Sequence, residues 1–252
     1  MNPPKNQNAS IWDKKAENYN RFSHDPHSFQ ALILSKINHR CIYFDGKTVL
    51  DIGCGTGVYT LYIAKEALHV NALDFSQEML NILREDAIKE GLEHKLTFTC
   101  NTWSGFDHKE GFDILFSSMS PAFQSDADFK KMHDMAREHC VYLGWGGKRE
   151  STLLDPIFRA HDQALNVPAG SEKLRAWLER TKIVYEAEYI EEKRLHVKPY
   201  DKALESVLWH FEINALTPDS GRVKTLLTMM QNAEGNIPFE TTIGVELISW
   251  KK

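Results

Sequence analysis

The sequence has few cysteines, no long hydrophobic run and no excess of basic residues. Its four cysteines (Cys41, Cys54, Cys100 and Cys140) include no C-x-x-C pair, so neither a metal site nor a dithiol redox site is indicated. No segment approaches the roughly 20 apolar residues that span a bilayer, and the polar first ten residues lack the apolar core of a signal peptide. We therefore expect a reduced, cytoplasmic protein that makes no membrane contact.

The charge balance argues against a general nucleic-acid-binding protein. The formal net charge is −5, whereas binding along a phosphate backbone favours a basic surface. Hydrophobic residues make up 42% and charged residues 26% of the 252 residues, which is typical of a soluble globular protein. This length favours one domain with an additional segment.

Short apolar runs alternate with helical segments from residue 47 onward. The expected strands are 47–52, 69–73, 95–100, 112–117 and 140–143. Ser76 is expected to cap the helix after the second strand, and Gly91 to end it. Strands that alternate with helices of this length predict an α/β protein with a doubly wound, mostly parallel sheet.

The two ends of this alternating pattern differ from it. Residues 1–45 are expected to form a polar tail and a helical cap, and residues 46–252 the main domain. The alternation stops after Gly147, so a helical insertion after the fifth strand is expected at about 148–185. Further expected elements are a strand at 187–197, whose charged residues 191–194 we expect to be solvated, two helices at 201–211 and 217–232, and a last strand at 241–250.

A glycine-rich turn follows the first strand, in Asp51-Ile-Gly53-Cys-Gly55-Thr-Gly57. Glycines in such a turn let the backbone approach a ligand, which would lie at the carboxyl end of the strand. The spacing is Gly-x-Gly-x-Gly, and Val58 stands where the dinucleotide-binding fingerprint Gly-x-Gly-x-x-Gly has its third glycine. A pyrophosphate-containing ligand is therefore disfavoured.

Two acidic residues refine this ligand. Asp51 immediately precedes the turn, where a carboxylate suits a ligand with an ammonium group better than a pyrophosphate. Asp74 ends the second strand, where a carboxylate can accept both hydroxyls of a ribose. The two positions together indicate a ligand that has a ribose and a positive charge.

With these features, the sequence resembles the class I S-adenosylmethionine-dependent methyltransferases. The matching segments are Val49-Leu-Asp-Ile-Gly-Cys-Gly-Thr-Gly57, Leu73-Asp-Phe-Ser-Gln-Glu-Met-Leu80 and, at the N-terminus, Trp12-Asp-Lys-Lys-Ala-Glu-Asn-Tyr19. The resemblance covers about residues 12–145. It implies a seven-stranded sheet in the order 3-2-1-4-5-7-6 with the last strand antiparallel, and S-adenosyl-L-methionine as the cofactor.

The resemblance also implies a set of cofactor-binding residues. Gly53, Gly55 and Gly57 would line the methionine and ribose, and Asp74 would hold the ribose. The other expected members are Tyr19 as a closing hydroxyl, Asp51, Phe75 and Met79 beside the adenine, Asn101, Thr102 and Trp103 after the third strand, and Ser118 at the end of the fourth. Asn101 stands where many relatives have an aspartate, and the Asn/Asp-Pro-Pro-Tyr/Phe motif of enzymes that methylate planar amino groups is absent.

The expected function is methyl transfer by direct displacement to a small-molecule acceptor. The alternatives are methylation of RNA or protein, a nicotinamide dehydrogenase, and a non-catalytic protein that only binds the cofactor. No catalytic residue is assigned, because a methyl transfer from a sulfonium needs a base only for a protonated acceptor. The acceptor atom and the oligomeric state stay open at this point.

Overall fold

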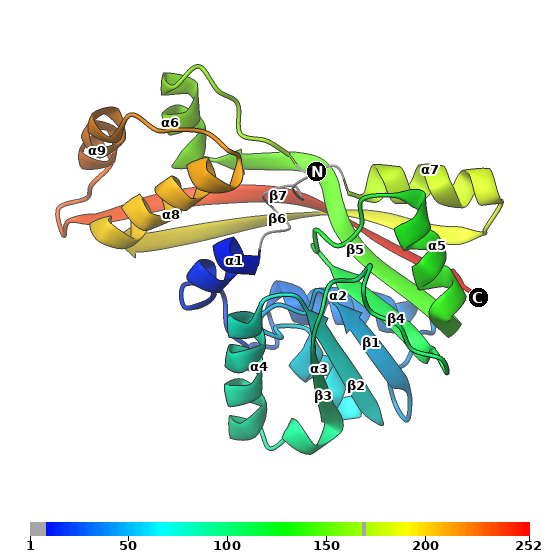
Figure 1. Cartoon of the computed structure of the whole chain (residues 1–252). Helices are drawn as coiled ribbons and strands as arrows, with labels where there is room; N and C mark the ends of the chain where they lie inside the picture. The colour runs from blue at the N-terminus through cyan, green and yellow to red at the C-terminus, as the bar shows by residue number, and fades with distance from the viewer. Residues whose placement is uncertain (1–8, 168–169) are drawn as a thin grey trace. The chain divides into compact units, whose positions relative to one another are not determined.

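One seven-stranded sheet organises the computed structural model, which describes residues 9–167 and 170–252 (Figure 1). Its strand order is β3-β2-β1-β4-β5-β7-β6, with one strand antiparallel to the others, so the predicted fold class and order are confirmed. In chain order the strands are β1 (Thr48–Ile52), β2 (His69–Asp74), β3 (Leu96–Cys100), β4 (Phe112–Ser118), β5 (Ala136–Ser151), β6 (Tyr185–Pro199) and β7 (Asn236–Lys251).

The parallel part of the sheet sets the position of the glycine turn. β1 pairs in parallel with β2 and β4, β2 pairs with β3, and β4 pairs with β5. β1 is buried along its whole length except at Thr48, as expected of a strand covered on both faces. The carboxyl ends of β1, β2 and β4 therefore meet at one edge of the sheet, where Gly53, Asp74 and Ser118 follow or end these strands.

The chain divides into two compact units. Of the described residues, the larger unit contains 9–144, 170–188 and 246–252, and the smaller unit contains 145–167 and 189–245. The larger unit carries α1 (Ala9–Ala16), α2 (Phe29–His39), α3 (Thr60–Glu66), α4 (Gln77–Lys89), the short 3-10 helix Glu93–Lys95, α5 (Asp126–Met135) and α7 (Ser171–Thr181). The smaller unit carries α6 (Leu154–Ala160), α8 (Tyr200–Ile213) and α9 (Ser220–Met229). Each unit has a hydrophobic core of its own.

The range predicted as one helical insertion, about 148–185, is divided between these units. α6 packs into the core of the smaller unit, where Phe158 stacks on Phe211 with 4.6 Å between the ring centroids. α7 packs against α5 in the larger unit, where Trp177 contacts Phe129. The two helices that follow β5 therefore belong to different cores.

β5 is much longer than the strand 140–143 that the sequence predicts. The prediction ended there because glycines and charged residues follow, in Gly144-Trp-Gly-Gly-Lys-Arg-Glu150. The extended strand is supported by neighbours far along the chain: a Cβ placed on Gly244 of β7 would lie 2.9 Å from the Lys148 Cβ. Close strand pairing accounts for a glycine at such a position.

The two helix signals around α4 are confirmed. The Ser76 hydroxyl accepts a hydrogen bond from the Met79 amide at 3.3 Å, which caps the first turn of α4. Gly91 follows the helix with a φ of +70°, the left-handed conformation that glycine adopts without strain. The described part of the predicted N-terminal cap, residues 9–45, belongs to the larger unit, and residues 1–8 of the predicted tail lie outside the described residues.

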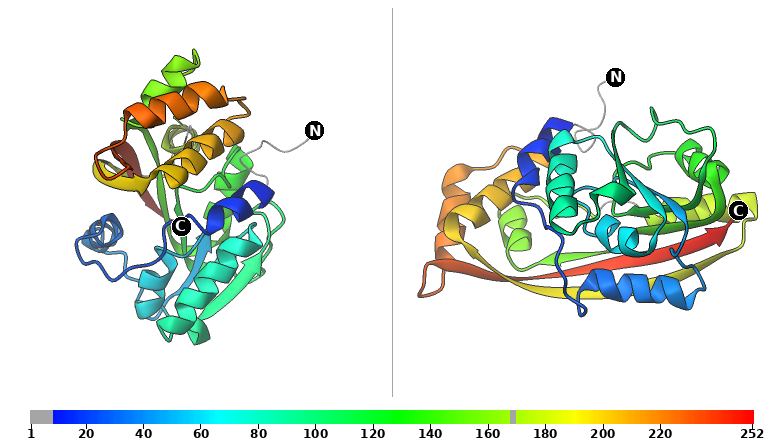
Figure 2. Two further views of the ribbon diagram at one scale, coloured as in Figure 1. Left: turned by 90° about the vertical axis from the view of Figure 1, so that its left-hand side faces the viewer. Right: turned by 90° about the horizontal axis from the view of Figure 1, so that it is seen from below.

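Arg40, just after α2, links this helix to the parts of β6 and β7 that belong to the larger unit. Its guanidinium donates to the Ser249 hydroxyl at 3.0 Å and to the carbonyl oxygens of Leu247 and Glu186 at 3.2 and 3.3 Å. The Arg40 side chain is only 8% exposed. The right-hand view of Figure 2 shows α2 beside β6 and β7.

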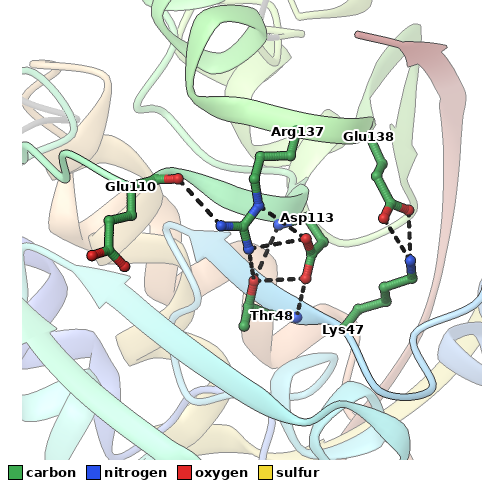
Figure 3. A network of polar contacts seen from close by, with 6 residues as sticks. All are labelled: Lys47, Thr48, Glu110, Asp113, Arg137 and Glu138. Carbon is green, nitrogen blue, oxygen red and sulfur yellow. Dashed lines mark hydrogen bonds and ion pairs between the residues drawn. The ribbon is translucent and has the colours of Figure 1, made fainter.

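A polar clasp lies at the amino ends of β1, β4 and β5, away from the glycine turn (Figure 3). The Asp113 carboxylate accepts hydrogen bonds from the Thr48 amide and hydroxyl at 2.8 Å and from the Arg137 guanidinium at 2.9 Å. Burial alone would raise the pKa of Asp113, but these hydrogen bonds and the Arg137 charge outweigh burial and hold the pKa below its ordinary value. Beside them, Lys47 pairs with Glu138 at 2.6 Å. Each of the three strands thus contributes a residue to the clasp.

We expect Asp113→Asn to lower the free energy of unfolding by about 1–3 kcal/mol at pH 7, because it removes a charged partner of three donors. A lowered folded-state pKa gives stability that is present above the unfolded pKa and lost as pH falls through the folded one. The deficit of the variant should therefore shrink below about pH 4. Urea unfolding from pH 3 to pH 8 would measure it, with the exposed Asp45→Asn as control. A variant as stable as the wild type at pH 7 would contradict the role of the clasp.

Candidate functional site

The glycine turn is held against β2 by backbone hydrogen bonds. The amides of Gly53 and Cys54 both donate to the Leu73 carbonyl, at 2.7 and 3.1 Å. Gly53, Gly55 and Gly57 have φ values of +72°, +55° and +81°. The turn therefore takes a left-handed conformation three times within five residues, and this is a backbone that non-glycine residues resist.

The three glycines serve two different purposes. A Cβ on Gly53 would lie 2.0 Å from the Ser120 hydroxyl, and one on Gly57 would lie 2.0 Å from the Leu83 Cδ1, so both are needed for close packing. A Cβ on Gly55 would meet no atom within 4 Å. Gly55 is thus the glycine of the turn that leaves room for a ligand to approach the backbone.

Asp74 connects the end of β2 to this turn and to α4. Its Oδ2 accepts from the Gly55 amide and its Oδ1 from the Ser76 amide, both at 2.8 Å. Burial is the largest influence and raises the pKa of Asp74 to about 6, against the backbone hydrogen bonds from Ser76, Gly55 and Phe75 and with the negative charge of Asp13. Each carboxylate oxygen has two lone pairs, so Asp74 can accept further hydrogen bonds from a diol.

Asp51 is a second buried carboxylate at the same edge. It is 2% exposed, and the Thr60 hydroxyl donates to its Oδ2 at 2.6 Å. Burial raises its pKa to about 7; the Thr60 hydrogen bond lowers the pKa and the nearby Asp74 raises it again. Oδ1 of Asp51 takes no hydrogen bond from any residue that the structure describes. Two carboxylates that resist ionisation together create a site that a positive charge would stabilise.

The N-terminal segment is attached to the turn and to α4. α1 packs on α4, and the Asp13 carboxylate accepts from the Ser76 hydroxyl at 2.5 Å. The Thr56 hydroxyl, within the turn, donates to the Asn20 carbonyl at 2.5 Å. Arg21 pairs with Asp86 of α4 at 2.6 Å. Residues 13–21 therefore lie along the edge of the glycine turn.

The other residues predicted for the site are placed as follows. Tyr19 is 37% exposed and contacts Trp12 edge to face. Phe75 is half-buried, Met79 is 2% exposed, Asn101 and Thr102 are exposed, and Ser118 is half-buried. The Asn101 amide donates to the Asp74 carbonyl at 3.0 Å, which brings the end of β3 next to β2.

Trp103 differs from its predicted neighbours. It is 3% exposed and lies in the hydrophobic core of the larger unit, in contact with Phe106 and Phe123. Its indole N–H donates to the Asp128 carbonyl at 3.2 Å, and the Lys131 ammonium lies 4.4 Å from the ring centroid. The side chain thus anchors the loop after β3 in the core.

Sequence reasoning missed four polar residues and the strained backbone of a fifth residue at the end of the fourth strand. The partners are Asp13, Thr56, Thr60 and Ser120, whose contacts are given above. The strained residue is Met119, directly after β4, with a φ of +51°; its amide donates to the Leu143 carbonyl at 2.7 Å. Strain of this kind is common at functional sites. Asp13 and Thr56 lie within the quoted motifs, but nothing in the sequence pairs them with Ser76 and Asn20.

The described residues contain no group of three or more His, Cys, Asp or Glu side chains arranged to hold a metal ion. None of the helices within 9–167 and 170–252 has the length and apolar character needed to cross a membrane.

Two comparisons with known proteins indicate the same family. Residues 49–141 match a family model described as a methyltransferase domain. The cypemycin N-terminal methyltransferase of a Streptomyces species is 34% identical in an alignment of 170 residues that covers 66% of this chain and 66% of its own. This chain belongs to the class I S-adenosylmethionine-dependent methyltransferase family.

Solved structures share the fold over nearly the whole chain. An S-adenosylmethionine-dependent methyltransferase from Geobacter sulfurreducens, solved with S-adenosyl-L-homocysteine, has a TM-score of 0.53 at 13% identity and covers 95% of this chain and 98% of its own. The cyclase SpnF has a TM-score of 0.57 at 15% identity, covering 99% of this chain and 97% of its own. At these identities the likeness shows the fold alone. The chain spans between 24% and 43% of the length of several other curated relatives.

We expect Asp51→Asn to stabilise the ligand-free protein by about 1–3 kcal/mol at pH 8, because Asn cannot ionise in this buried position. A carboxyl whose folded pKa is raised contributes stability that is present below the unfolded pKa and lost as pH rises through the folded one. The advantage of the variant should therefore appear between about pH 4 and pH 7. Thermal unfolding of both proteins over this range measures it, and a variant that is less stable at pH 8 would refute the raised pKa.

The different surroundings of Gly55 and Gly57 lead to a second prediction. Gly57→Ala should lower the free energy of unfolding by about 2–4 kcal/mol, because the new methyl group meets Leu83 and the φ is unfavourable. Gly55→Ala should cost only about 1 kcal/mol, the penalty of the left-handed backbone. Denaturant titration compares them, and equal losses would mean that the space in front of Gly55 is filled.

Proposed function

We propose that the chain is an S-adenosyl-L-methionine-dependent methyltransferase that transfers a methyl group to a small-molecule acceptor by direct in-line displacement. The observation that carries this proposal is the pair of buried carboxylates, Asp51 and Asp74, beside the open space in front of Gly55. Family membership supports the chemistry, and the geometry supports the cofactor.

The residues of this edge fit the chemical groups of the cofactor. Asp74 accepts from the Gly55 and Ser76 amides and is also influenced by that of Phe75, and it keeps acceptor capacity for a hydroxyl of the ribose. Asp51 offers negative charge to the ammonium of the methionine portion, and its free Oδ1 lacks a donor among the described residues. A cation bound here would favour ionisation of both carboxyls and so offset their burial.

Further residues are proposed for the rest of the cofactor. Phe75 and Met79 would border the adenine, and the Asn101 side chain, at the end of β3, would face its amino group. Gly53 and Gly57 shape the turn, Ser118 ends β4, and Thr102 lies two residues after β3. Tyr19 lies in the segment that contacts the edge of the turn. We leave Trp103 out of the proposed site because its indole is packed in the core.

The cofactor, when bound, supplies a methyl group on a sulfonium with a neutral leaving group. The protein then needs to hold the acceptor in line and exclude water, which can contribute on the order of 7–11 kcal/mol. The Asp13–Ser76 and Thr56–Asn20 hydrogen bonds attach residues 13–21 along the edge of the turn, from which they would limit the access of water. A general base is unnecessary for an acceptor that is unprotonated at neutral pH.

A small acceptor is proposed from the charge of the chain. The net charge of −5 does not favour an RNA substrate. A protein substrate would need an open groove, and no feature of the described residues indicates one. One relative is named as the cypemycin N-terminal methyltransferase. A peptide N-terminus is therefore the first alternative acceptor. A protein that binds the cofactor without transferring a methyl group is the second alternative.

Binding of S-adenosyl-L-homocysteine tests the cofactor proposal directly. At a hundred times its dissociation constant it should stabilise the protein by about 2.7 kcal/mol, whereas NAD should give no shift. Asp74→Ala should weaken binding at least about tenfold in calorimetry, because a charged hydrogen-bond acceptor is lost, while Asp45→Ala should not. Affinity should also rise from about pH 5 to pH 8 as Asp74 and Asp51 ionise. Stabilisation by NAD alone, or unchanged affinity of Asp74→Ala, would overturn the proposal.

A further inference from the structure

β6 directs its basic residues toward the core of the smaller unit and its apolar residues toward solvent. We call the face with Arg194, His196 and Lys198 the sheltered side. Leu195 and Val197 are 82% and 63% exposed, whereas Arg194, His196 and Lys198 are half-buried. Strands that cover a core show the opposite pattern, with apolar residues inward. The sequence-based expectation that residues 191–194 form a solvated face is thus wrong for two of them: the side chains of Glu192 and Arg194 are only 14% and 32% exposed.

The sheltered side of β6 lies against β7 and the core of the smaller unit. The His196 ring stacks on Phe239 with 4.7 Å between centroids, and its Nε2 is 2.9 Å from the Thr241 hydroxyl. The Lys198 ammonium lies 5.8 Å from the centroid of the same Phe239 ring. Phe239 itself packs against the buried cluster that α6, α8 and α9 form. Two basic side chains are therefore fixed on one aromatic ring.

The positive charge on this side has little compensation. Arg194 pairs with Glu192 at 2.5 Å. Neither His196 nor Lys198 forms an ion pair with any residue in the described part of the chain. Burial lowers the pKa of Lys198, and burial together with the charges of Lys198 and Arg194 lowers that of His196. Basic groups that are partly withdrawn from water without a counter-charge gain free energy from an anion.

On the opposite side of β6, basic and acidic residues form ion pairs. There Lys193 pairs with Glu240 at 2.8 Å, and Lys148 pairs with Glu191 at 3.0 Å. In each of these ion pairs one partner is exposed, Lys193 in the first and Glu191 in the second. The imbalance of charge is confined to the sheltered side.

We propose that the sheltered side of β6, with His196, Lys198 and Arg194, binds the anionic group, a carboxylate or a phosphate, of a small molecule. The partly buried position favours a small ligand over an extended polyanion. Lys198 supplies the charge that no carboxylate of the described residues balances, and Arg194, which pairs with Glu192, supplies further N–H donors. The His196 ring donates from Nδ1 in the tautomer in which its Nε2 accepts from the Thr241 hydroxyl. This inference concerns residues of the smaller unit and does not depend on the proposed methyl transfer.

The test uses the full chain with inorganic phosphate and succinate as probes, at constant ionic strength adjusted with sodium chloride. Isothermal titration calorimetry should detect at least one probe binding, and the stronger of the two identifies phosphate or carboxylate as the preferred group. Lys198→Gln and His196→Gln should each weaken that binding by about tenfold. Lys198→Arg, which keeps the charge, should retain it to within about threefold.

Lys193→Gln is the matched control, because it removes the same charge from the other side of the same strand. It should change affinity by less than about twofold. Lys198→Gln should also leave the melting temperature of the ligand-free protein unchanged or raise it, whereas a purely structural Lys198 would make it fall. Binding of S-adenosyl-L-homocysteine by these variants should stay as in the wild type, which separates this result from the cofactor proposal.

Three results would overturn the proposal. One is the absence of binding of both probes beyond the chloride reference. Another is an equal loss of affinity in Lys193→Gln and Lys198→Gln, which would indicate a general charge effect. The third is a loss of binding in Lys198→Gln accompanied by a lower melting temperature without ligand.

Discussion

The hydrogen bonds of the Asp74 carboxylate are the contact on which the arrangement of the candidate site depends. One oxygen holds the Gly55 amide and the other holds the Ser76 amide, so a single buried side chain joins the glycine turn, the end of β2 and the start of α4. Ser76 in turn caps α4 and holds Asp13 of the N-terminal helix. A carboxylate in this position is ionised at a free-energy cost, as its raised pKa shows, and the backbone amides reduce that cost.

The two ends of the parallel strands use acidic residues in opposite ways. At the amino ends, Asp113 is surrounded by donors and by Arg137, and its pKa is lowered. At the carboxyl ends, Asp51 and Asp74 lie close to each other, and their pKa values are raised. Paired charges stabilise a fold, whereas unpaired buried charges reduce its stability and are typical of binding sites. The contrast separates the structural contacts at one end of β1 from the proposed cofactor site at the other.

The glycine turn and the helix and strand ends beside it could be predicted because their signals are local. The turn from Gly53 to Gly57 needs left-handed backbone, Ser76 and Gly91 mark the ends of one helix, and Asp74 ends a strand whose neighbour was recognised. Trp103 could not be placed in the same way, because its burial depends on Phe106, Phe123 and Asp128 rather than on its nearest neighbours. The partners Thr60 and Asp13 were missed for the same reason: each meets its carboxylate or hydroxyl through folding and not through sequence spacing.

The sequence alone determined the doubly wound sheet, its strand-to-helix rhythm and the glycine turn with its two acids, since hydrophobic periodicity and backbone preference act over a few residues. Only the tertiary structure decided how far β5, β6 and β7 extend, which core each of α6 and α7 joins, and that β6 turns its basic residues inward. The physical reason is that strand register and the burial of a face depend on partners far along the chain. The sequence of β6 does not by itself determine which face of the strand is buried. The contacts of His196 with Phe239 and Thr241 of β7 decide it.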